Sequence, residues 1–316
     1  MVSKFTIQNQ TTLETASFGF DISNDFVYKE DGLDWGFAEG SHATYTYPGQ
    51  IGSYVAMTSV KERVVTIIGY AHYVPTAEEI RTKTREELKE LVTKTIEGKK
   101  TFLSGILNPV DFVKILIGDY HLIGKPSQSI QFGNTREENN EYFCQFKIVV
   151  FCNNPLFVRD IPTDQGLSES KPMFHFPLVL RADKGVIMSI RKDFLLMGIE
   201  NDGDTQVGAV IKFKARGVIV NPRIENITNN QVIQITKTMK KGEEIIINTE
   251  EGDTKGITGY VDGEYVNYLK YWDYENSWIK FPQGTSLVGY STENDSEKLL
   301  DVIIELSPGK YALEEM

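Results

Sequence analysis

The chain has 316 residues, of which 41% are hydrophobic and 24% are charged. This composition is typical of a folded globular protein and excludes a disordered or collagen-like chain. The formal net charge of −11 disfavours a protein that grips the phosphate backbone of nucleic acid, because that function needs clustered Lys and Arg. A chain of this length favours two domains of roughly 150 residues each.

The sequence disfavours both a membrane-spanning segment and a disulfide bond. The first residues hold no apolar signal core, and no run approaches the ~18 apolar residues that span a bilayer. We therefore expect a protein that is made and kept in the cytoplasm, without a membrane partner. Cys144 and Cys152 share one strand-like run, where they would lie about 26 Å apart, beyond disulfide reach. We expect both as buried apolar fillers.

The first half of the chain predicts β-strands and one helix. Residues 64–70 and 145–151 are rich in β-branched and aromatic residues, as in most segments of the chain, so the protein should be mainly β. A helix is expected over residues 76–97. The Thr76 hydroxyl can cap the first turn of this helix, and the Glu79 side chain can accept a hydrogen bond from the Thr76 N–H in return. Gly98 suits the position that follows the end of a helix.

A linker separates the two expected domains. Residues 153–170 are rich in Asn, Pro, Asp, Ser and Gly, which favours a boundary near Ile161. We predict an N-terminal β domain over residues 1–160 and a C-terminal domain over residues 161–316. The second domain shows no convincing helix, so an all-β sandwich is expected.

Catalytic motifs are absent from the sequence. It contains no GxSxG elbow, no GxxxxGK[ST] loop and no HExxH zinc pair. The acidic residues 200–204 suggest calcium but fail the EF-hand spacing, and an Asx-rich turn explains them better. A pair of remote carboxylates for glycoside hydrolysis stays open, although nothing points to one. We expect a protein that is not an enzyme and has no cofactor, metal or catalytic residue.

An aromatic run covers residues 271–278. Tyr271, Trp272 and Tyr274 could form a platform on which sugar rings stack. A sandwich core needs the same residue types, and we favour packing. Trp278 suits the core best, because apolar Ile279 follows it.

The order of several motifs resembles the distal tail protein family (Dit-type) of siphophage tails and related tail-like particles. The first half contributes residues 59–69, the capped helix and residues 107–109. The second half contributes more specific matches in the correct order, at residues 176–178, 199–204, 220–226, 241–249 and 277–284. Residues 260–277 depart from the family pattern, since they are aromatic and acidic where a plainer hairpin is expected.

The resemblance implies a fold and a set of partners. An N-terminal β-sandwich-like domain with one helix would close into a homohexameric ring, and a galectin-like β-sandwich would project from it. The ring would connect the tail tube protein to a tail-associated hub or lysin protein. The tape-measure protein and DNA would pass through the lumen without specific binding. The protein would thus sit at the tail tip or baseplate of a phage or tail-like bacteriocin, contractile or not, assembled in the host cytoplasm.

The ring interface is expected in the first domain, because edge strands can be completed by neighbouring copies. The candidate residues are Arg63, Val65, Ile67, Tyr70 and Glu87. The alternative function is a carbohydrate-binding adhesin that grips host surface glycans through the aromatic run of the second domain. A cell-wall hydrolase ranks third.

Overall fold

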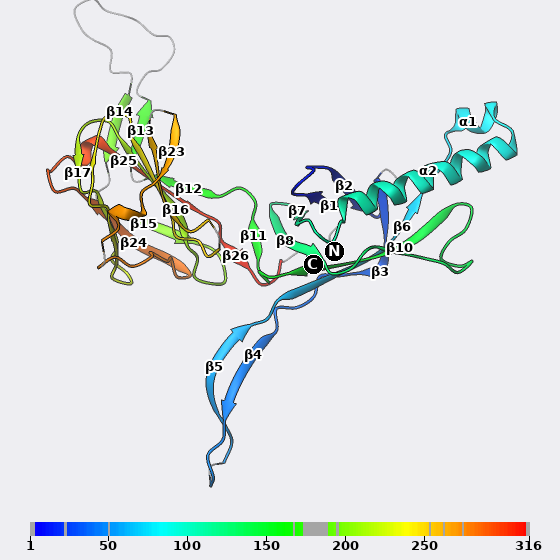
Figure 1. Cartoon of the computed structure of the whole chain (residues 1–316), viewed down its shortest axis with the longest axis horizontal. Helices are drawn as coiled ribbons and strands as arrows, with labels where there is room; N and C mark the ends of the chain where they lie inside the picture. The colour runs from blue at the N-terminus through cyan, green and yellow to red at the C-terminus, as the bar shows by residue number, and fades with distance from the viewer. Residues whose placement is uncertain are drawn as a thin grey trace, which may run out of the picture. The chain divides into compact units, whose positions relative to one another are not determined.

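The computed structural model describes residues 4–21, 24–49, 51–166, 168–172, 189–193, 196–252, 254–261, 263–273 and 275–313. The mainly β organisation expected from the sequence is confirmed (Figure 1). The chain divides into two compact units, Met1–Asp160 with Lys310–Met316 and Ile161–Gly309. No helix in the described part of the chain is both long and apolar enough to cross a membrane.

The end of the chain returns to the first unit, which corrects the expected second domain of residues 161–316. Strand β26 (Gly309–Lys310) adjoins β11 (Phe157–Arg159) in the first unit's sheet. Leu313 packs against the core of the same unit. Because these contacts join residues that are far apart in the sequence, the composition of the chain could not predict them.

The remaining elements of the first unit are, in chain order, β1 (Lys4–Asn9), β2 (Thr15–Gly19), β3 (Phe26–Asp34), β4 (Gly40–Tyr45), β5 (Tyr54–Val60), β6 (Arg63–His72), α1 (Ala77–Thr82), α2 (Arg85–Ile106), β7 (Val113–Ile117), β8 (Tyr120–Pro126), β9 (Gln131–Phe132) and β10 (Phe143–Cys152). Ten strands form one sheet in the order β26-β11-β8-β7-β1-β2-β3-β6-β10-β9. A further pairing of β8 with β10 closes this sheet on itself. The first unit is therefore a barrel-like sheet, with α2 lying against β6, β1 and β2 (Figure 1).

Alternate residues of the strands fill the inside of this sheet, as the period of two in a strand requires. Phe5 and Phe18 stack with ring centroids 4.9 Å apart, and Phe26 continues the stack at 5.3 Å from Phe18. The ring of Phe146 packs edge-on against the ring of Phe26, with centroids 5.7 Å apart, and completes this aromatic cluster. Cys152 is a free, buried thiol in the same core, as expected.

The expected single helix over residues 76–97 is wrong in its continuity and its end. The Thr76–Glu79 capping box is present, but α1 stops at Thr82. Thr84 then caps a second helix, with Glu87 as its reciprocal partner. Helix α2 passes Gly98 and continues to Ile106, because Leu103 and Ile106 are buried in the core. Burial of the last two turns outweighs the helix-ending preference of Gly98.

The second unit is a two-sheet sandwich. Its elements are β12 (Thr163–Gly166), β13 (Ser168–Pro172), β14 (Ser189–Asp193), β15 (Leu196–Asn201), β16 (Ala209–Ala215), β17 (Ile219–Val220), β18 (Arg223–Asn226), β19 (Gln231–Gln234), β20 (Thr238–Met239), β21 (Glu244–Asn248), β22 (Gly256–Val261), β23 (Glu264–Asn267), η1 (Leu269–Tyr271), β24 (Gly284–Ser291), η2 (Glu297–Leu299) and β25 (Leu300–Leu306). One sheet has the order β12-β25-β16-β21-β22-β23 and the other β15-β24-β18-β19. Buried residues of both sheets form one core, for example Phe213 of β16 and Val288 of β24.

Candidate assembly surfaces

Strands β4 and β5 form a hairpin that stands clear of the barrel (Figure 1). Apart from Ser41, every residue of the two strands is exposed. Gly49 and Gly52 take positive φ at the tip, which L side chains rarely adopt. A two-stranded ribbon with no packed face is marginal by itself. Among the described residues, the hairpin is therefore held by its own strand pairing and not by a packed core.

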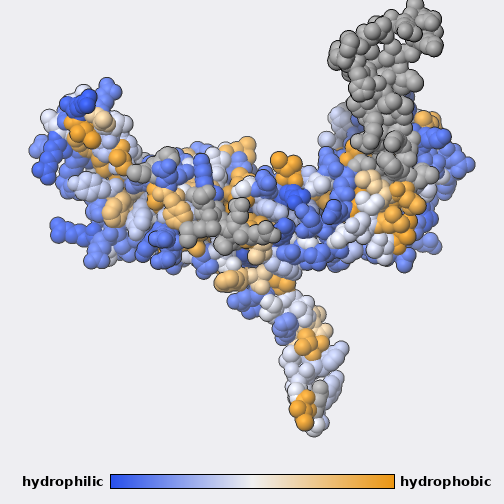
Figure 2. All heavy atoms as spheres, turned by 180° about the vertical axis from the view of Figure 1, so that it is seen from behind, coloured by the Kyte–Doolittle hydropathy of each residue, from blue (hydrophilic) through white to orange (hydrophobic). Residues whose placement is uncertain are grey.

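The hairpin carries large apolar side chains in spite of its exposure. Tyr45, Tyr47, Tyr54 and Met57 are each more than 60% exposed, and Ile51 is fully exposed. Figure 2 shows hydrophobic residues at the end of this hairpin. Clusters of exposed apolar side chains on one projection are typical of protein–protein contact sites.

Arg63 fixes the foot of the hairpin. Its guanidinium is 2% exposed and donates hydrogen bonds to the carbonyl oxygens of Pro155 at 2.7 Å and Tyr311 at 2.6 Å. Nη1 is shared between the carbonyls of Trp35 and Gly36, at 3.3 and 3.2 Å. Burial lowers the pKa of Arg63, which still stays protonated at neutral pH. One side chain thus links residues 35–36, which precede the hairpin, to Pro155 after β10 and to Tyr311.

A hollow of about 580 Å³ lies beside this anchor. Leu33, Trp35, Phe37 and Leu313 supply its apolar lining, and Phe37 is 84% exposed. Gly36 turns the chain here with a φ of +65°, and a Cβ at this position would lie 2.4 Å from the Val64 carbonyl oxygen. The foot of the hairpin therefore combines a fixed backbone with an open apolar surface.

Three of the five expected interface side chains point into the first unit. Val65 and Ile67 are fully buried in the barrel core, and Arg63 is occupied as described. These side chains are therefore buried within the chain itself, and a subunit contact at these positions stays a prediction. Tyr70 is half-buried and packs edge-on against Phe143 at 5.1 Å.

Glu87, the fifth expected residue, is exposed but engaged locally. Its carboxylate accepts hydrogen bonds from the backbone N–H and the hydroxyl of Thr84, at 2.7 and 2.9 Å. These bonds lower the pKa of Glu87. Its observed role is to cap α2.

The opposite face of β6 is the exposed one, because a strand alternates its side chains with a period of two. Val64 is exposed and lies opposite Phe151 of β10, which lies opposite Lys125 of β8. Ile123 and Phe112 extend this apolar patch, and the Lys125 ammonium sits 4.4 Å from the Phe112 ring centroid. The first unit thus presents an apolar outer patch as well as the hairpin.

The expected glycan residues of the second unit are partly buried. Tyr271 packs edge-on against Tyr268 at 5.2 Å, and Trp272 stacks on Trp278 at 4.4 Å. All three outer rings, Tyr271, Trp272 and Trp278, pack against the sandwich core. Tyr274 lies outside the described residues. One face of Trp272 is therefore covered by a neighbouring ring.

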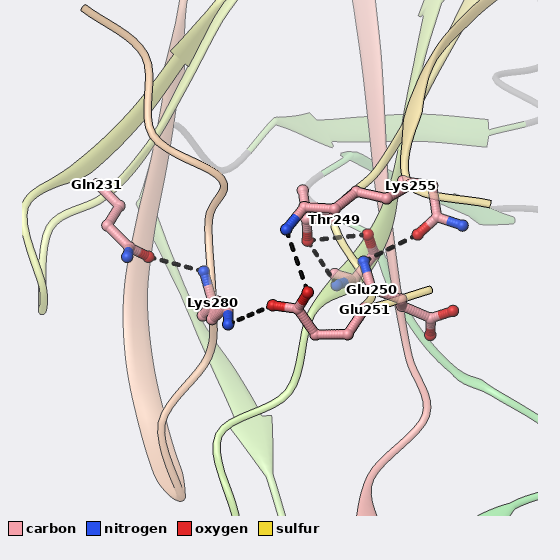
Figure 3. A network of polar contacts seen from close by, with 8 residues as sticks. Gln231, Thr249, Glu250, Glu251, Lys255 and Lys280 are labelled. Carbon is pink, nitrogen blue, oxygen red and sulfur yellow. Dashed lines mark hydrogen bonds and ion pairs between the residues drawn. The ribbon is translucent and has the colours of Figure 1, made fainter. Parts of the chain in front are cut away.

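The residues that carry the family resemblance have structural roles in the second unit. The Thr249 hydroxyl accepts from the Ala209 N–H at 2.8 Å and lies 3.2 Å from its carbonyl oxygen. Lys280 forms an ion pair with Glu251 at 2.5 Å (Figure 3). Asn201 accepts from the Gly203 N–H at 3.0 Å, so residues 200–204 form the expected Asx turn. The motif at residues 176–178 lies outside the described residues.

A polar cluster is buried near β21. Glu243 pairs with Lys237, and the Tyr268 hydroxyl donates to Glu243 at 2.9 Å. Burial opposes ionisation of Glu243, but hydrogen bonds from Lys237, Lys240 and Tyr268 lower its pKa overall. Burial, followed by the bond to Glu243, raises the pKa of Tyr268 to about 12. Every member is satisfied within the cluster, as expected of a structural network.

A second polar cluster joins β7 and β8 to the end of the first unit. Asp160 pairs with Lys114 and lies 3.1 Å from His121 Nδ1. Burial lowers the pKa of His121, so its ring is neutral at pH 7. Among the described residues, no group of His, Cys, Asp and Glu could hold a metal ion.

The fold of the chain matches solved structures of phage tail components. The Dit protein of phage SPP1, described as a hub adsorption apparatus of phages that infect Gram-positive bacteria, matches 96% of this chain and 98% of its own. The two share 10% identity with a TM-score of 0.61. This likeness confirms the Dit-type fold that the motifs suggested.

A chain from the structure of the phage P2 baseplate in its activated conformation with Ca shares 10% identity with this chain, over 98% of each chain, with a TM-score of 0.46. A scan against protein-family models and a search of curated proteins found no match. The neighbours are structural components of phage hubs and baseplates.

Proposed function

We propose that this chain is a distal tail protein that forms a homohexameric ring and connects the tail tube to the tail-tip hub of a phage or tail-like particle. The observation that carries the proposal is the β4–β5 hairpin. It is an apolar projection that no part of the described chain covers.

The hairpin supports assembly with copies of the same chain. It points away from its own barrel, so no described residue of the first unit buries its side chains, and a second copy of the chain can do so (Figure 1). The first unit also presents apolar acceptors, the hollow beside Trp35 and the outer patch around Phe151. A projection that docks on a different surface of an identical neighbour is a heterologous contact, which closes into a ring when the rotation allows.

Docking would bury the apolar side chains of the hairpin. Full burial of a side chain such as Ile51 or Met57 contributes about 1.5–3 kcal/mol. Several such residues per hairpin act against a cost of association of about 4–15 kcal/mol. Each subunit in a ring makes this contact twice, once with its hairpin and once with its acceptor surface.

The other partners follow from the same position in the tail. The last tail tube ring would dock on one side, and a tail-associated hub or lysin protein on the other. The tape-measure protein and DNA would pass through the lumen. A net charge of −11 suits passage of DNA without specific binding. In this role the chain is structural, has no catalytic activity, and is assembled in the bacterial cytoplasm.

The hairpin can be tested by substitution. The variant Tyr47→Ser/Ile51→Ser/Tyr54→Ser should remain folded, because none of the three side chains is buried. Its mass by sedimentation velocity should be that of a monomer under conditions where the wild-type chain is a hexamer. Tyr265→Ala, an equally exposed residue of the second unit, is the matched control and should stay hexameric. Wild-type assembly by the triple variant would refute the hairpin's role.

A further inference from the structure

A row of side chains crosses the outer face of the six-stranded sheet. Lys214 of β16 lies opposite Glu244 of β21, which lies opposite Tyr260 of β22. Tyr260 in turn lies opposite Tyr265 of the edge strand β23. Directly paired residues of antiparallel strands project from the same face. The four side chains therefore form a strip about 14 Å long, three strand spacings.

The strip faces away from the sandwich core. The next residues along the same strands, Phe213 and Ile245, are fully buried on the opposite face. Tyr265 is 70% exposed and Tyr260 is 37% exposed. Their ring centroids are 4.9 Å apart at 48°, so the pair forms a shallow aromatic step.

The polar groups of the strip are not used by the fold. Among the described residues, no hydrogen bond or ion pair engages the side chains of Lys214 or Glu244, or the hydroxyls of Tyr260 and Tyr265. In contrast, the next polar pair on this face, Lys212 with Glu305, is an ion pair. The strip thus offers aromatic faces beside unpaired donors and acceptors.

We infer that this strip binds a neutral polysaccharide chain. The rings of Tyr260 and Tyr265 stack on the apolar C–H faces of sugar rings, as aromatic surfaces do. Glu244 accepts hydrogen bonds from sugar hydroxyls, and Lys214 donates to their oxygens. An extended strip without a deep pocket suits the side of a chain more than the end of a small ligand.

Charge selects the class of glycan. Lys214 and Glu244 are of opposite sign, so the strip has no net charge. The whole chain carries −11, which repels polyanions. An acidic cell-wall polymer is therefore disfavoured and a neutral hexose polymer favoured. This site is separate from Tyr271 and Trp272, and it does not depend on ring formation.

The full-length protein would be applied to an array of immobilised neutral glucans, mannans and galactans, with hyaluronate as the anionic polymer. Affinities of the positive neutral polymers would then be measured by biolayer interferometry. Tyr265→Ala should bind about ten-fold more weakly, the value of one stacking contact. Tyr142→Ala, 69% exposed in the first unit, is the matched control and should bind as the wild type does.

Each other result would overturn the site. No binding to any neutral polymer, preference for hyaluronate, or binding that survives Tyr265→Ala and Tyr260→Ala would each reject the inference. Light scattering on the same samples separates this test from the proposed ring, because Tyr265→Ala should leave the oligomeric mass unchanged.

Discussion

Replacement of Arg63 by Met should destabilise the first unit by about 3–5 kcal/mol. The guanidinium makes two short bonds, to Pro155 and Tyr311, and one shared between Trp35 and Gly36. Each bond from a charged donor contributes about 1.5–3 kcal/mol. Part of the free energy of these bonds is offset, because the guanidinium charge no longer has to be buried. The carbonyl oxygens, however, stay buried without a hydrogen-bond donor.

Urea unfolding followed by Trp fluorescence measures this loss. Trp35 is the first unit's own reporter, because the other two of the three tryptophans, Trp272 and Trp278, lie in the second unit and can be replaced by Phe. Lys61→Met is the matched control within the same unit. Lys61 pairs with Glu39 on the surface, where an ion pair contributes about 0–1 kcal/mol. Equal losses for Arg63→Met and Lys61→Met would refute the anchoring role.

Three further predictions concern local structure. Thr84→Ala should cost about 1 kcal/mol and speed amide exchange in the first turn of α2, whereas the mid-helix Thr93→Ala should not. Thr249→Val should lower the second unit's stability by about 1–3 kcal/mol in urea, because the Ala209 N–H loses its acceptor, and Thr249→Ser should restore it. The folded-state pKa of Tyr268, about 12, lies above its usual value near 10. The contribution of Tyr268 to the stability of the second unit should be complete below pH 10 and lost as the pH rises toward 12. Thermal melts should therefore show a fall in stability over this pH range, and Tyr268→Phe should remove that fall.

The sequence predicted what depends on local pattern. Residues 64–70 and 145–151 lie in β6 and β10, which pair along their whole length. The Thr76–Glu79 capping box also formed as expected. These features depend on the period of two and on hydrogen bonds within one turn, so neighbouring residues contain the required information.

The helix boundaries needed tertiary information. Thr84 fits the apolar spacing of a continuous helix, yet its hydroxyl caps a new one. Gly98 is a good helix terminator, but the burial of Leu103 and Ile106 extends α2 beyond it. A second Thr-x-x-Glu motif at Thr84 and Glu87 was the signal that could have located the break.

Three of the residues expected at the ring interface lie on the inner face of one strand. Residues 63, 65 and 67 face the core, while Val64 faces outward. The hairpin was missed because its apolar residues pack on nothing within the described chain, so they read as an ordinary strand pair. The turn at Pro48-Gly49, with Tyr45 and Tyr47 before it and Tyr54 after it, was the available signal.

The most direct test of the proposed ring is the mass of the purified full-length chain by multi-angle light scattering, with negative-stain microscopy of the same sample. We expect a mass six times that of the 35.8-kDa chain, and closed six-fold rings with a central hole. A monomer at the highest attainable concentration that still forms no ring when mixed with preassembled tail tubes would contradict it.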